Sequence, residues 1–220
     1  MTQSKPSVLV IAGSHGGQLC GPVIHQRLLV SGVVEPTLHN EPLALGPADF
    51  QPYDVVLYYG ENSHERRDFS DEAEMALREY VRGGKGFVGV HVASYRAAGR
   101  LEDLIGGNSP GCVPAPEALP RVNRIQWEFD VHVADPTHPV TAGVQDFRII
   151  DEHYRSTVAQ DVHVLLRGDE ELGHYPLAWV RREGRGRVFH TPLGHRPDGF
   201  GEPQFWRLIL QGIRWVAAPD

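Results

Sequence analysis

Three short apolar runs, each rich in large apolar or β-branched residues, constrain the fold more than any other feature of the chain. They occupy Ser7–Ala12, residues 53–59 and residues 86–91, and glycine or polar residues follow each of them. Such runs are typical of strands that are buried on both faces, as in a parallel sheet. A shorter strand is expected over residues 33–38. The sequence therefore predicts a buried parallel sheet at the centre of the fold.

Helical segments alternate with these strands. Residues 17–31 follow the first strand, and Ser70 is a good N-cap for a helix that begins with acidic residues. Gly83 comes where that helix should end. Residues 203–217 form a last amphipathic helix with a proline at its start. The alternation predicts parallel pairing, right-handed crossovers and helices on both faces of the sheet.

The second half of the chain has a different pattern. Residues 127–133 and 161–166 alternate between apolar and polar, as in strands with one solvated face. Residues 176–180 and 187–191 flank a Glu-Gly-Arg-Gly turn, which predicts a β-hairpin. Residues 106–120 are rich in glycine and proline, and we expect an irregular surface loop there. The C-terminal half is therefore predicted to be partly antiparallel.

The length of the chain favours a single domain. Its 220 residues can bury one good core, and no internal repeat or low-complexity tract divides them. We expect one α/β domain over residues 1–220, with a parallel sheet, helices on both faces and additional antiparallel strands in the C-terminal half.

Composition excludes several kinds of partner. The formal net charge is -7 and no run of Lys or Arg occurs, so phosphate backbones would be repelled and nucleic acid is not expected. No apolar stretch approaches the length of a membrane span, so we expect a soluble protein without a membrane partner. Cys20 and Cys112 are far apart in sequence and form no CxxC pair, which favours a reduced, cytoplasmic setting.

Candidate site residues follow from the position of the strands. In open α/β sheets, ligands bind beyond the carboxyl ends of the strands. His15 follows the first strand, Glu61 the strand over residues 53–59, and His195 the last hairpin strand. The loop over residues 13–17 lacks the GxGxxG and GxxxxGK[ST] patterns, so it is read as a tight turn rather than a phosphate cradle.

The segment over residues 89–93 has the pattern of a nucleophile elbow. It runs from a strand into a small-x-polar-x-small turn, which lifts one side chain above the sheet. The lifted residue is His91, where such elbows carry cysteine or serine. The alternative interpretation is a histidine that is hydrogen-bonded to a neighbouring loop.

A cluster of polar residues at 151–154 adds two carboxylates, an imidazole and a phenol. In an extended segment, Asp151 and His153 point one way, whereas Glu152 and Tyr154 point the other. Both pairs could not enter one cleft equally. The alternative is a polar corner on the surface.

The chain resembles the ThuA-like (trehalose utilisation) family of the class I glutamine-amidotransferase-like superfamily. The matching segments span nearly the whole chain: YDVVL at 53–57, YVRGGKGFVGVHVA at 80–93, DPTHPVTAG at 135–143, DEHY at 151–154, GRVFHTPLGH at 186–195 and GIRW at 212–215. The run through His91, taken together with Leu-Gly-His195, is the most specific part. The resemblance implies a flavodoxin-like parallel sheet with extra antiparallel strands.

The same resemblance implies that glutaminase activity has been lost. True amidotransferases carry a cysteine at the elbow, whereas His91 occupies that position here and His195 resembles their late histidine. Release of ammonia from glutamine needs a thiolate that attacks the amide, and an imidazole forms no comparable acyl intermediate. Neither Cys20 nor Cys112 is expected near the elbow.

Two classes of function remain open. In the first, the protein is an enzyme acting on a carbohydrate, with a keto-sugar as a plausible substrate. His91, His195 and Glu152 are then the catalytic candidates, working as general acids and bases. The second alternative is a non-catalytic module that binds a sugar or a protein. Turnover that depends on His91 would distinguish the two.

Further predictions concern ligands of this cleft. His91, His195 and Asp151 could bind a divalent metal ion, zinc being the first choice, with an open position for substrate. His15, Glu61 and Tyr154 are candidates for contacts to a small carbohydrate. Homo-oligomers are common in such folds, and nothing in the sequence identifies an interface.

Overall fold

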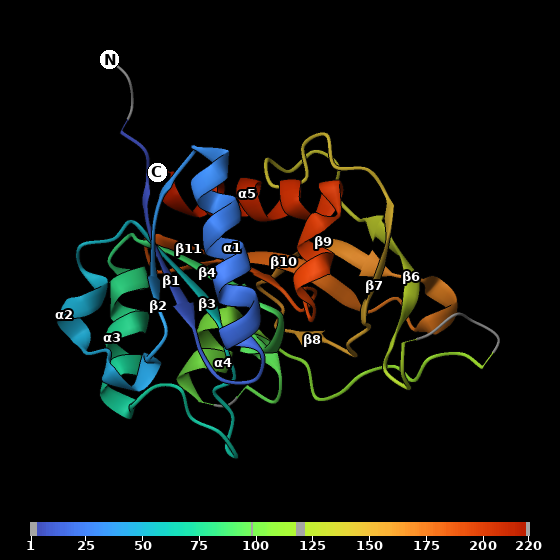
Figure 1. The fold of residues 1–220 in the computed structure, drawn as a ribbon, viewed down its shortest axis with the longest axis horizontal. Coiled ribbons are helices and arrows are strands. Elements are labelled where there is room, and N and C mark those ends of the chain that lie inside the picture. The colour runs from blue at the N-terminus through green and yellow to red at the C-terminus, as the bar shows by residue number, and fades with distance from the viewer. Residues whose placement is uncertain (1–3, 98, 118–121, 219–220) are drawn as a thin grey trace.

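A nine-stranded sheet forms the centre of the protein in the computed structural model, which describes residues 4–97, 99–117 and 122–218 (Figure 1). In spatial order its strands are β2 (Glu35–His39), β1 (Ser7–Ala12), β3 (Val55–Tyr59), β4 (Gly86–Val90), β11 (Gly186–Thr191), β10 (Pro176–Glu183), β9 (His163–Gly168), β6 (Gln126–Val133) and β7 (Phe147–Glu152). The helices are α1 (Gly17–Ser31), α2 (Pro47–Phe50), α3 (Asp71–Arg82), α4 (Arg100–Ile105) and α5 (Pro203–Ala217).

The sheet has two halves with different pairing. The strands β2, β1, β3, β4 and β11 pair in parallel, and we call them the parallel half. The strands β10, β9, β6 and β7 pair antiparallel, β10 being joined to β11 by the predicted hairpin, and they form the antiparallel half. The predicted α/β fold, with a parallel sheet and extra antiparallel strands, is therefore confirmed.

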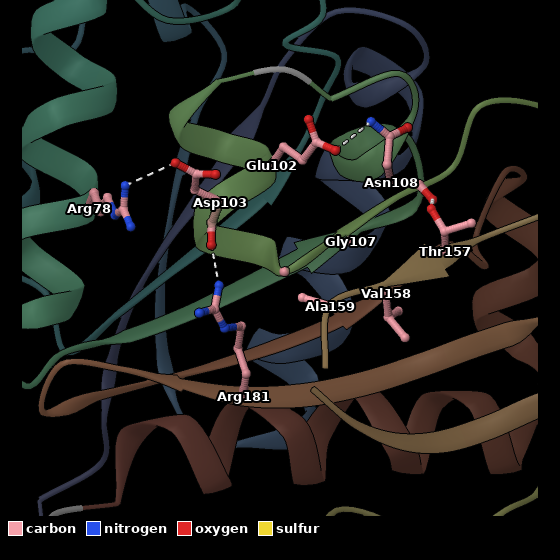
Figure 2. A pocket seen from close by; sticks show the side chains of 10 residues that line it. Arg78, Glu102, Asp103, Gly107, Asn108, Thr157, Val158, Ala159 and Arg181 are labelled. Atoms are coloured by element: carbon pink, nitrogen blue, oxygen red, sulfur yellow. Dashed lines mark hydrogen bonds and ion pairs between the residues drawn. The ribbon is translucent and has the colours of Figure 1, made fainter. Parts of the chain in front are cut away.

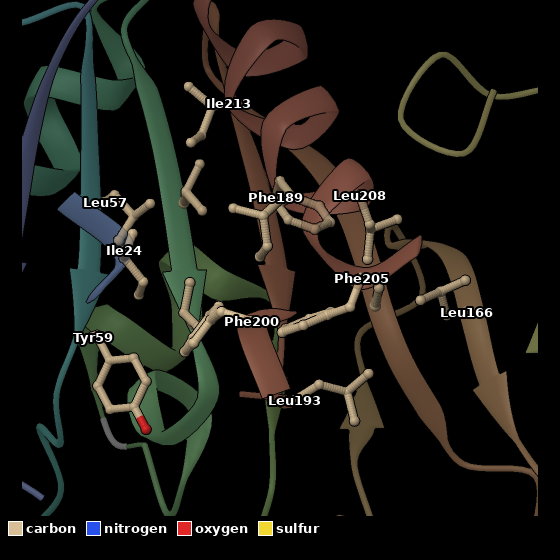
Figure 3. Close-up of a cluster of buried hydrophobic side chains, with 14 of the residues drawn as sticks. Ile24, Leu57, Tyr59, Leu166, Phe189, Leu193, Phe200, Phe205, Leu208 and Ile213 are labelled. Carbon is tan, nitrogen blue, oxygen red and sulfur yellow. The ribbon is translucent and has the colours of Figure 1, made fainter. Parts of the chain in front are cut away.

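Helices cover both faces of the parallel half. Along β3, Val55 and Tyr59 belong to the hydrophobic core under α1 and α5, whereas Val56 belongs to the core under α2, α3 and α4. Figure 3 shows part of the first core, where Phe189 of β11 and Leu208 of α5 point toward each other. Burying each such side chain contributes about 1.5–3 kcal/mol, so two covered faces explain the uninterrupted apolar strands.

The helix boundaries follow the predicted capping. The Ser70 hydroxyl accepts a hydrogen bond from the Ala73 amide at 3.1 Å, and α3 ends at Gly83. The Glu202 carboxylate accepts from the Phe205 amide at 2.7 Å and caps α5. No helix in the described part of the chain is both long and apolar enough to cross a membrane.

The β6–β7 ribbon extends past the sheet. Because each neighbouring pair from β11 to β7 is antiparallel, β7 runs in the same direction as β11 and β4. β6 pairs with β9 only through Val131–Val133, although it pairs with β7 back to Gln126. The start of β6 and the end of β7 therefore project beyond the carboxyl end of β9. This projection carries the end of β7 over the edge where β4 and β11 end.

The prediction of an irregular surface loop over residues 106–120 is wrong in part. Two of its residues form β5 (Gly107–Asn108), which pairs with β8 (Thr157–Val158), and Ser109 is fully buried. The cause is a chain of buried hydroxyl groups that the sequence pattern does not reveal: Ser109 Oγ lies 2.8 Å from Ser94 Oγ and 2.9 Å from Ser156 Oγ. Residues 118–121 of the predicted loop lie outside the described residues.

Candidate active site at the carboxyl edge of the sheet

His91 lies on the sharp turn that follows β4. Its backbone φ is 54°, in the left-handed region that non-glycine residues rarely adopt, and a short 3₁₀ helix begins there. Such a backbone outlier points to a functional constraint at this turn. Gly89 makes room for the neighbouring strand, because a Cβ there would lie 2.6 Å from Nδ1 of His190. The elbow pattern predicted from the sequence is therefore present, and the His91 side chain is fully buried.

The two ring nitrogens of His91 have different partners. Nδ1 lies 2.9 Å from the carbonyl oxygen of Pro192, and Nε2 lies 3.0 Å from Nδ1 of His195. Since a carbonyl oxygen only accepts, Nδ1 carries the proton and donates. Burial, followed by the nearby His195, lowers the pKa of His91 well below 6.5 and keeps the ring neutral. Nε2 therefore presents a lone pair to His195.

His195 comes from the loop after β11. The Tyr59 hydroxyl donates to the Gly194 carbonyl at 3.0 Å and holds this loop against β3. A quarter of the His195 side chain is exposed, whereas His91 has no exposed surface. Burial lowers the pKa of His195 as well. His195 is thus the member of the imidazole pair that solvent reaches.

Glu152, the last residue of β7, completes the cluster. Its Oε1 lies 3.4 Å from Nδ1 of His195, and its Oε2 lies 3.8 Å from Nε2 of His91. The Tyr154 hydroxyl donates to Oε2 at 2.7 Å and fixes the carboxylate. Glu152 and Tyr154 therefore share the side of the segment that faces the imidazoles, as the alternation of the extended chain requires.

Asp151 has a different position from that of Glu152. Its carboxylate accepts hydrogen bonds from the backbone amides of Gly194 at 2.6 Å, His195 at 3.0 Å and Glu152 at 2.8 Å. Burial raises the pKa of Asp151 to about 7, against the lowering effect of these three donors. The carboxylate joins the end of β7 to the His195 loop and lies outside the group of donors described next.

Three side chains fit a divalent metal ion. Among the described residues, one donor atom from each of His91, His195 and Glu152 lies within 4.8 Å of the other two. The two imidazole nitrogens lie 3.0 Å apart, Oε1 of Glu152 lies 3.4 Å from His195 and its Oε2 lies 3.8 Å from His91, whereas the ligands of a tetrahedral zinc ion are about 3.3 Å apart. The Nδ1–H bond from His91 to a backbone carbonyl is the usual support of a metal-binding histidine. Two imidazoles and a carboxylate are donors that zinc accepts, so these three residues could hold such an ion.

His15 and Glu61 form a second pair at the same edge. Nδ1 of His15 lies 2.8 Å from Oε2 of Glu61, and the Ser63 hydroxyl donates to Oε1 of Glu61 at 2.7 Å. After burial, the nearby His15 imidazole is among the groups that lower the pKa of both His91 and His195, so it lies close to them. The structure thus brings His15 and Glu61 to the neighbourhood of the three donors.

The prediction that neither cysteine lies near the elbow is wrong. Cys112 Sγ lies 3.8 Å from Oε2 of Glu152, and Cys20 Sγ lies 3.7 Å from the carbonyl oxygen of His195. Chain segments far apart in sequence bring them there, which spacing alone could not predict. Burial raises the pKa of Cys20 to about 11 and that of Cys112 to about 12, so both are protonated at neutral pH. Neither is an activated thiolate.

Four aromatic side chains that could stack on a sugar if they were exposed are buried. Tyr58, Tyr59 and Trp127 have no exposed surface, and Tyr154 is 2% exposed. Two of them instead stabilise the site through their hydroxyl groups: Tyr59 bonds to the His195 loop, and Tyr154 bonds to Glu152. Sequence patterns identified these residues but gave no sign of these long-range bonds.

A buried network that the sequence patterns did not predict supports the cluster. Nε2 of His190 lies 2.8 Å from the hydroxyl of Ser94. The Ser94 hydroxyl is hydrogen-bonded to that of Ser109, which is hydrogen-bonded in turn to that of Ser156. His190 precedes His195 on one chain segment, Ser94 follows His91 on another, and Ser156 follows Glu152 on a third. The network therefore connects the three segments that carry the donor atoms. Only the short spacing of Ser94 from the elbow could have suggested it.

A separate pocket lies between α4 and β8, away from the histidines (Figure 2). Its volume is about 540 Å³. The polar side chains in it bond to one another: Arg78 to Asp103 at 3.2 Å and Asn108 to Glu102 at 3.1 Å, while Arg181 donates to the Asp103 carbonyl. Among the described residues that line this pocket there is no histidine or cysteine, so the histidine cluster is the better candidate for metal or acid–base chemistry.

Comparisons with known proteins agree with this architecture. The ThuA family, described as trehalose utilisation, matches residues 7–216. A putative ThuA-like protein from Parabacteroides merdae is 23% identical, with a TM-score of 0.74 over 98% of this chain and 91% of the other. A second, from Bacteroides uniformis, is 18% identical, with a TM-score of 0.75 over 98% and 93%. No curated protein sequence matches the chain.

A further structural relative is a cytoplasmic protein from Salmonella typhimurium. It is 13% identical, with a TM-score of 0.67 over 98% of this chain and all of the other. At identities this low the structural likeness shows a shared fold, and the chemistry has to be argued from the site itself.

Proposed function

The chain belongs to the ThuA (trehalose utilisation) family, and on that premise we propose that it is an enzyme acting on a carbohydrate, with a keto-sugar as substrate, in a metal-binding cleft. The ligands of the divalent ion, zinc in the first instance, are His91, His195 and Glu152. One observation carries the proposal: two imidazole nitrogens and a carboxylate from distant segments converge at separations of 3.0–3.8 Å.

The ligand set has consequences for chemistry. A zinc ion held by three side chains supplies an open position at which a substrate carbonyl or hydroxyl is polarised. His91 supplies a neutral ring whose tautomer is fixed by the Pro192 carbonyl. His195, a quarter exposed, is the ligand that substrate approaches first. Asp151 acts as a positioning residue that holds the His195 backbone, in place of the ligand role expected from the sequence.

Substrate contacts are assigned to the second pair. His15 has 39% of its side chain exposed and faces solvent beside the cluster, while Glu61 is buried behind it. Tyr154 is buried and holds Glu152, so we propose for it a supporting role.

Glutaminase activity is excluded from the proposal, because the elbow carries an imidazole and both nearby thiols are protonated. The two free cysteines support a reduced, cytoplasmic setting.

The proposal is tested by metal stoichiometry and by substrate-dependent stability. Purified protein is stripped with a chelator, reloaded with zinc and analysed for metal, beside His91→Ala and the matched control His39→Ala, which replaces a half-buried histidine on the edge strand β2. We expect about one zinc per chain in the wild type and the control, and none in His91→Ala.

D-fructose then serves as a keto-sugar probe. A ligand at 100 times its Kd raises the free energy of unfolding by about 2.7 kcal/mol, and the zinc-loaded wild type should show such a rise whereas His91→Ala should not. Equal zinc content in all three proteins would contradict the proposed ligand set. A fructose effect that persists in His91→Ala would favour a non-catalytic sugar-binding module.

A further inference from the structure

His15 and Glu61 have the arrangement of an oriented imidazole base. Nδ1 of His15 bonds to Oε2 of Glu61 at 2.8 Å, so the carboxylate fixes the tautomer with the proton on Nδ1 and leaves the Nε2 lone pair free. Glu61 is 5% exposed, and Ser63 holds its other oxygen at 2.7 Å. An imidazole backed by a buried carboxylate is the combination that serves as general base in hydrolytic triads.

The backbone around His15 is built to aim this ring. The φ of His15 is 54°, the same left-handed conformation as at His91, although neither residue is glycine. Asp68 stabilises the turn, because its carboxylate accepts a hydrogen bond from the Ser14 amide at 2.9 Å. Gly13 is required there, because a Cβ would overlap the Asp68 carboxylate. A strained turn held by a buried carboxylate is expected where the position of a side chain matters.

His15 lies at the same edge of the sheet as the three proposed ligands. β1 and β4 are separated by β3 alone, so the turns that follow them are about 10 Å apart, the width of two strand spacings. The ring centroids of His15 and Tyr95 lie 5.8 Å apart, and those of Tyr95 and Tyr154 lie 5.9 Å apart, so Tyr95 connects His15 with the tyrosine that holds Glu152. His15 and His195 are the histidines of this site with exposed side chains.

We propose that His15, oriented by Glu61, is a catalytic base that moves a proton between adjacent carbons of an α-hydroxy carbonyl sugar. The inference rests on the proposed function, since His91, His195 and Glu152 would hold the metal that polarises the carbonyl oxygen. It adds a reaction class, the exchange of a carbonyl and a hydroxyl between neighbouring carbons.

The proton transfer balances without an oxidant or a second substrate. Nε2 of His15 takes the proton from the carbon that carries the hydroxyl. The electron pair of that C–H bond forms a carbon–carbon double bond, and the carbonyl pair moves onto oxygen to give an enediolate. Nε2–H then returns the proton to the former carbonyl carbon, while the hydroxyl proton passes to the other oxygen. Glu61 stabilises the imidazolium that exists between the two transfers.

Deuterium exchange measures this step directly. The probes are dihydroxyacetone, D-xylulose and D-fructose in D₂O, with the zinc-loaded full chain and proton NMR of the carbon-bound hydrogens. We expect exchange with the wild type and a loss of about 100-fold or more in His15→Gln, the range of general acid–base catalysis. His39→Gln, in the edge strand β2, is the matched control and should exchange at the wild-type rate.

Two further readouts separate positioning from loss of structure. Zinc content and melting temperature should be unchanged in His15→Gln and Glu61→Gln. Glu61→Gln removes the charge that orients the ring and stabilises the imidazolium, so its exchange rate should fall while its zinc content stays at the wild-type value.

The outcomes distinguish this inference from the proposed function. Zinc-bound wild type that exchanges none of the three probes, or His15→Gln that exchanges at the wild-type rate, overturns the inference and leaves the metal site intact. Wild type without zinc contradicts the proposed function, whereas exchange that still requires His15 in such protein supports the base.

Discussion

The parallel and antiparallel halves of the sheet differ in how they are covered and in what they supply to the site. β3 and β4 of the parallel half are buried along their whole length, because helices cover both faces. β7 of the antiparallel half is buried at alternate positions, and its Ile150 is 46% exposed. The parallel half supplies His15, His91 and His195 on turns after its strands, whereas the antiparallel half supplies Glu152 at the end of a projecting ribbon.

The two halves hold their site residues in different ways. Turns after buried parallel strands are held by the core on both faces, so they can sustain the backbone strain seen at His15 and His91. The ribbon has one solvated face and is tied to the His195 loop by the two hydrogen bonds that Asp151 accepts from the amides of Gly194 and His195. The parallel half thus positions the imidazoles, and the antiparallel half supplies the Glu152 carboxylate.

The largest expected difference between the halves is in stability. Ile11→Ala in β1 removes a fully buried side chain and should lower the free energy of unfolding by about 2–5 kcal/mol. The matched Ile150→Ala in β7 should cost less than about 1 kcal/mol, because nearly half of the side chain is already exposed. Urea unfolding of both variants checks this, and equal losses would contradict the difference in covering.

A second prediction concerns the pH dependence contributed by the parallel half. Burial lowers the pKa of His190 in β11 from 6.5 to about 3, so below pH 6.5 the unfolded chain binds a proton that the folded chain does not. The neutral ring therefore favours folding above pH 6.5, and this contribution is lost as pH falls, by about 1.4 kcal/mol per unit. His190→Gln should lose less stability than wild type between pH 6.5 and 5, by about 2 kcal/mol in urea unfolding. Parallel curves for the two proteins would refute a buried neutral His190.

The smallest effect, of opposite sign, is expected from the antiparallel half. His132 in β6 lies 2.9 Å from Asp146 and 3.1 Å from Asp169, which raise its pKa above 6.5. Its stabilisation is complete below pH 6.5 and is lost as pH rises through the raised value. Since 41% of the side chain is exposed, the effect should stay below about 1 kcal/mol. His132→Gln should be less stable than wild type at pH 5.5 and equal to it at pH 8.5, and a gap at pH 8.5 as large as at pH 5.5 would contradict the ion pairs.

Sequence patterns predicted the parallel half better than the antiparallel half for a physical reason. Buried strands and capped helices are local, so Ser7–Ala12 and Pro203–Ala217 could be read directly from the chain. The elbow at His91 is local as well. Which of the two carboxylates, Asp151 or Glu152, joins the imidazoles is not a local property. It depends on the amides of Gly194 and His195, which bind Asp151 from more than 40 residues away. The approach of Cys112 to Glu152 and the burial of Ser109 depend on long-range packing in the same way.

The central claim is that the two halves bring His91, His195 and Glu152 together as ligands of one metal ion. The visible spectrum of the cobalt(II)-loaded protein, compared with that of Glu152→Gln, tests it most directly. We predict the intense bands of four-coordinate cobalt in the wild type, and their loss or displacement in Glu152→Gln while His39→Gln keeps them. A wild-type spectrum that matches cobalt(II) free in buffer would contradict the account.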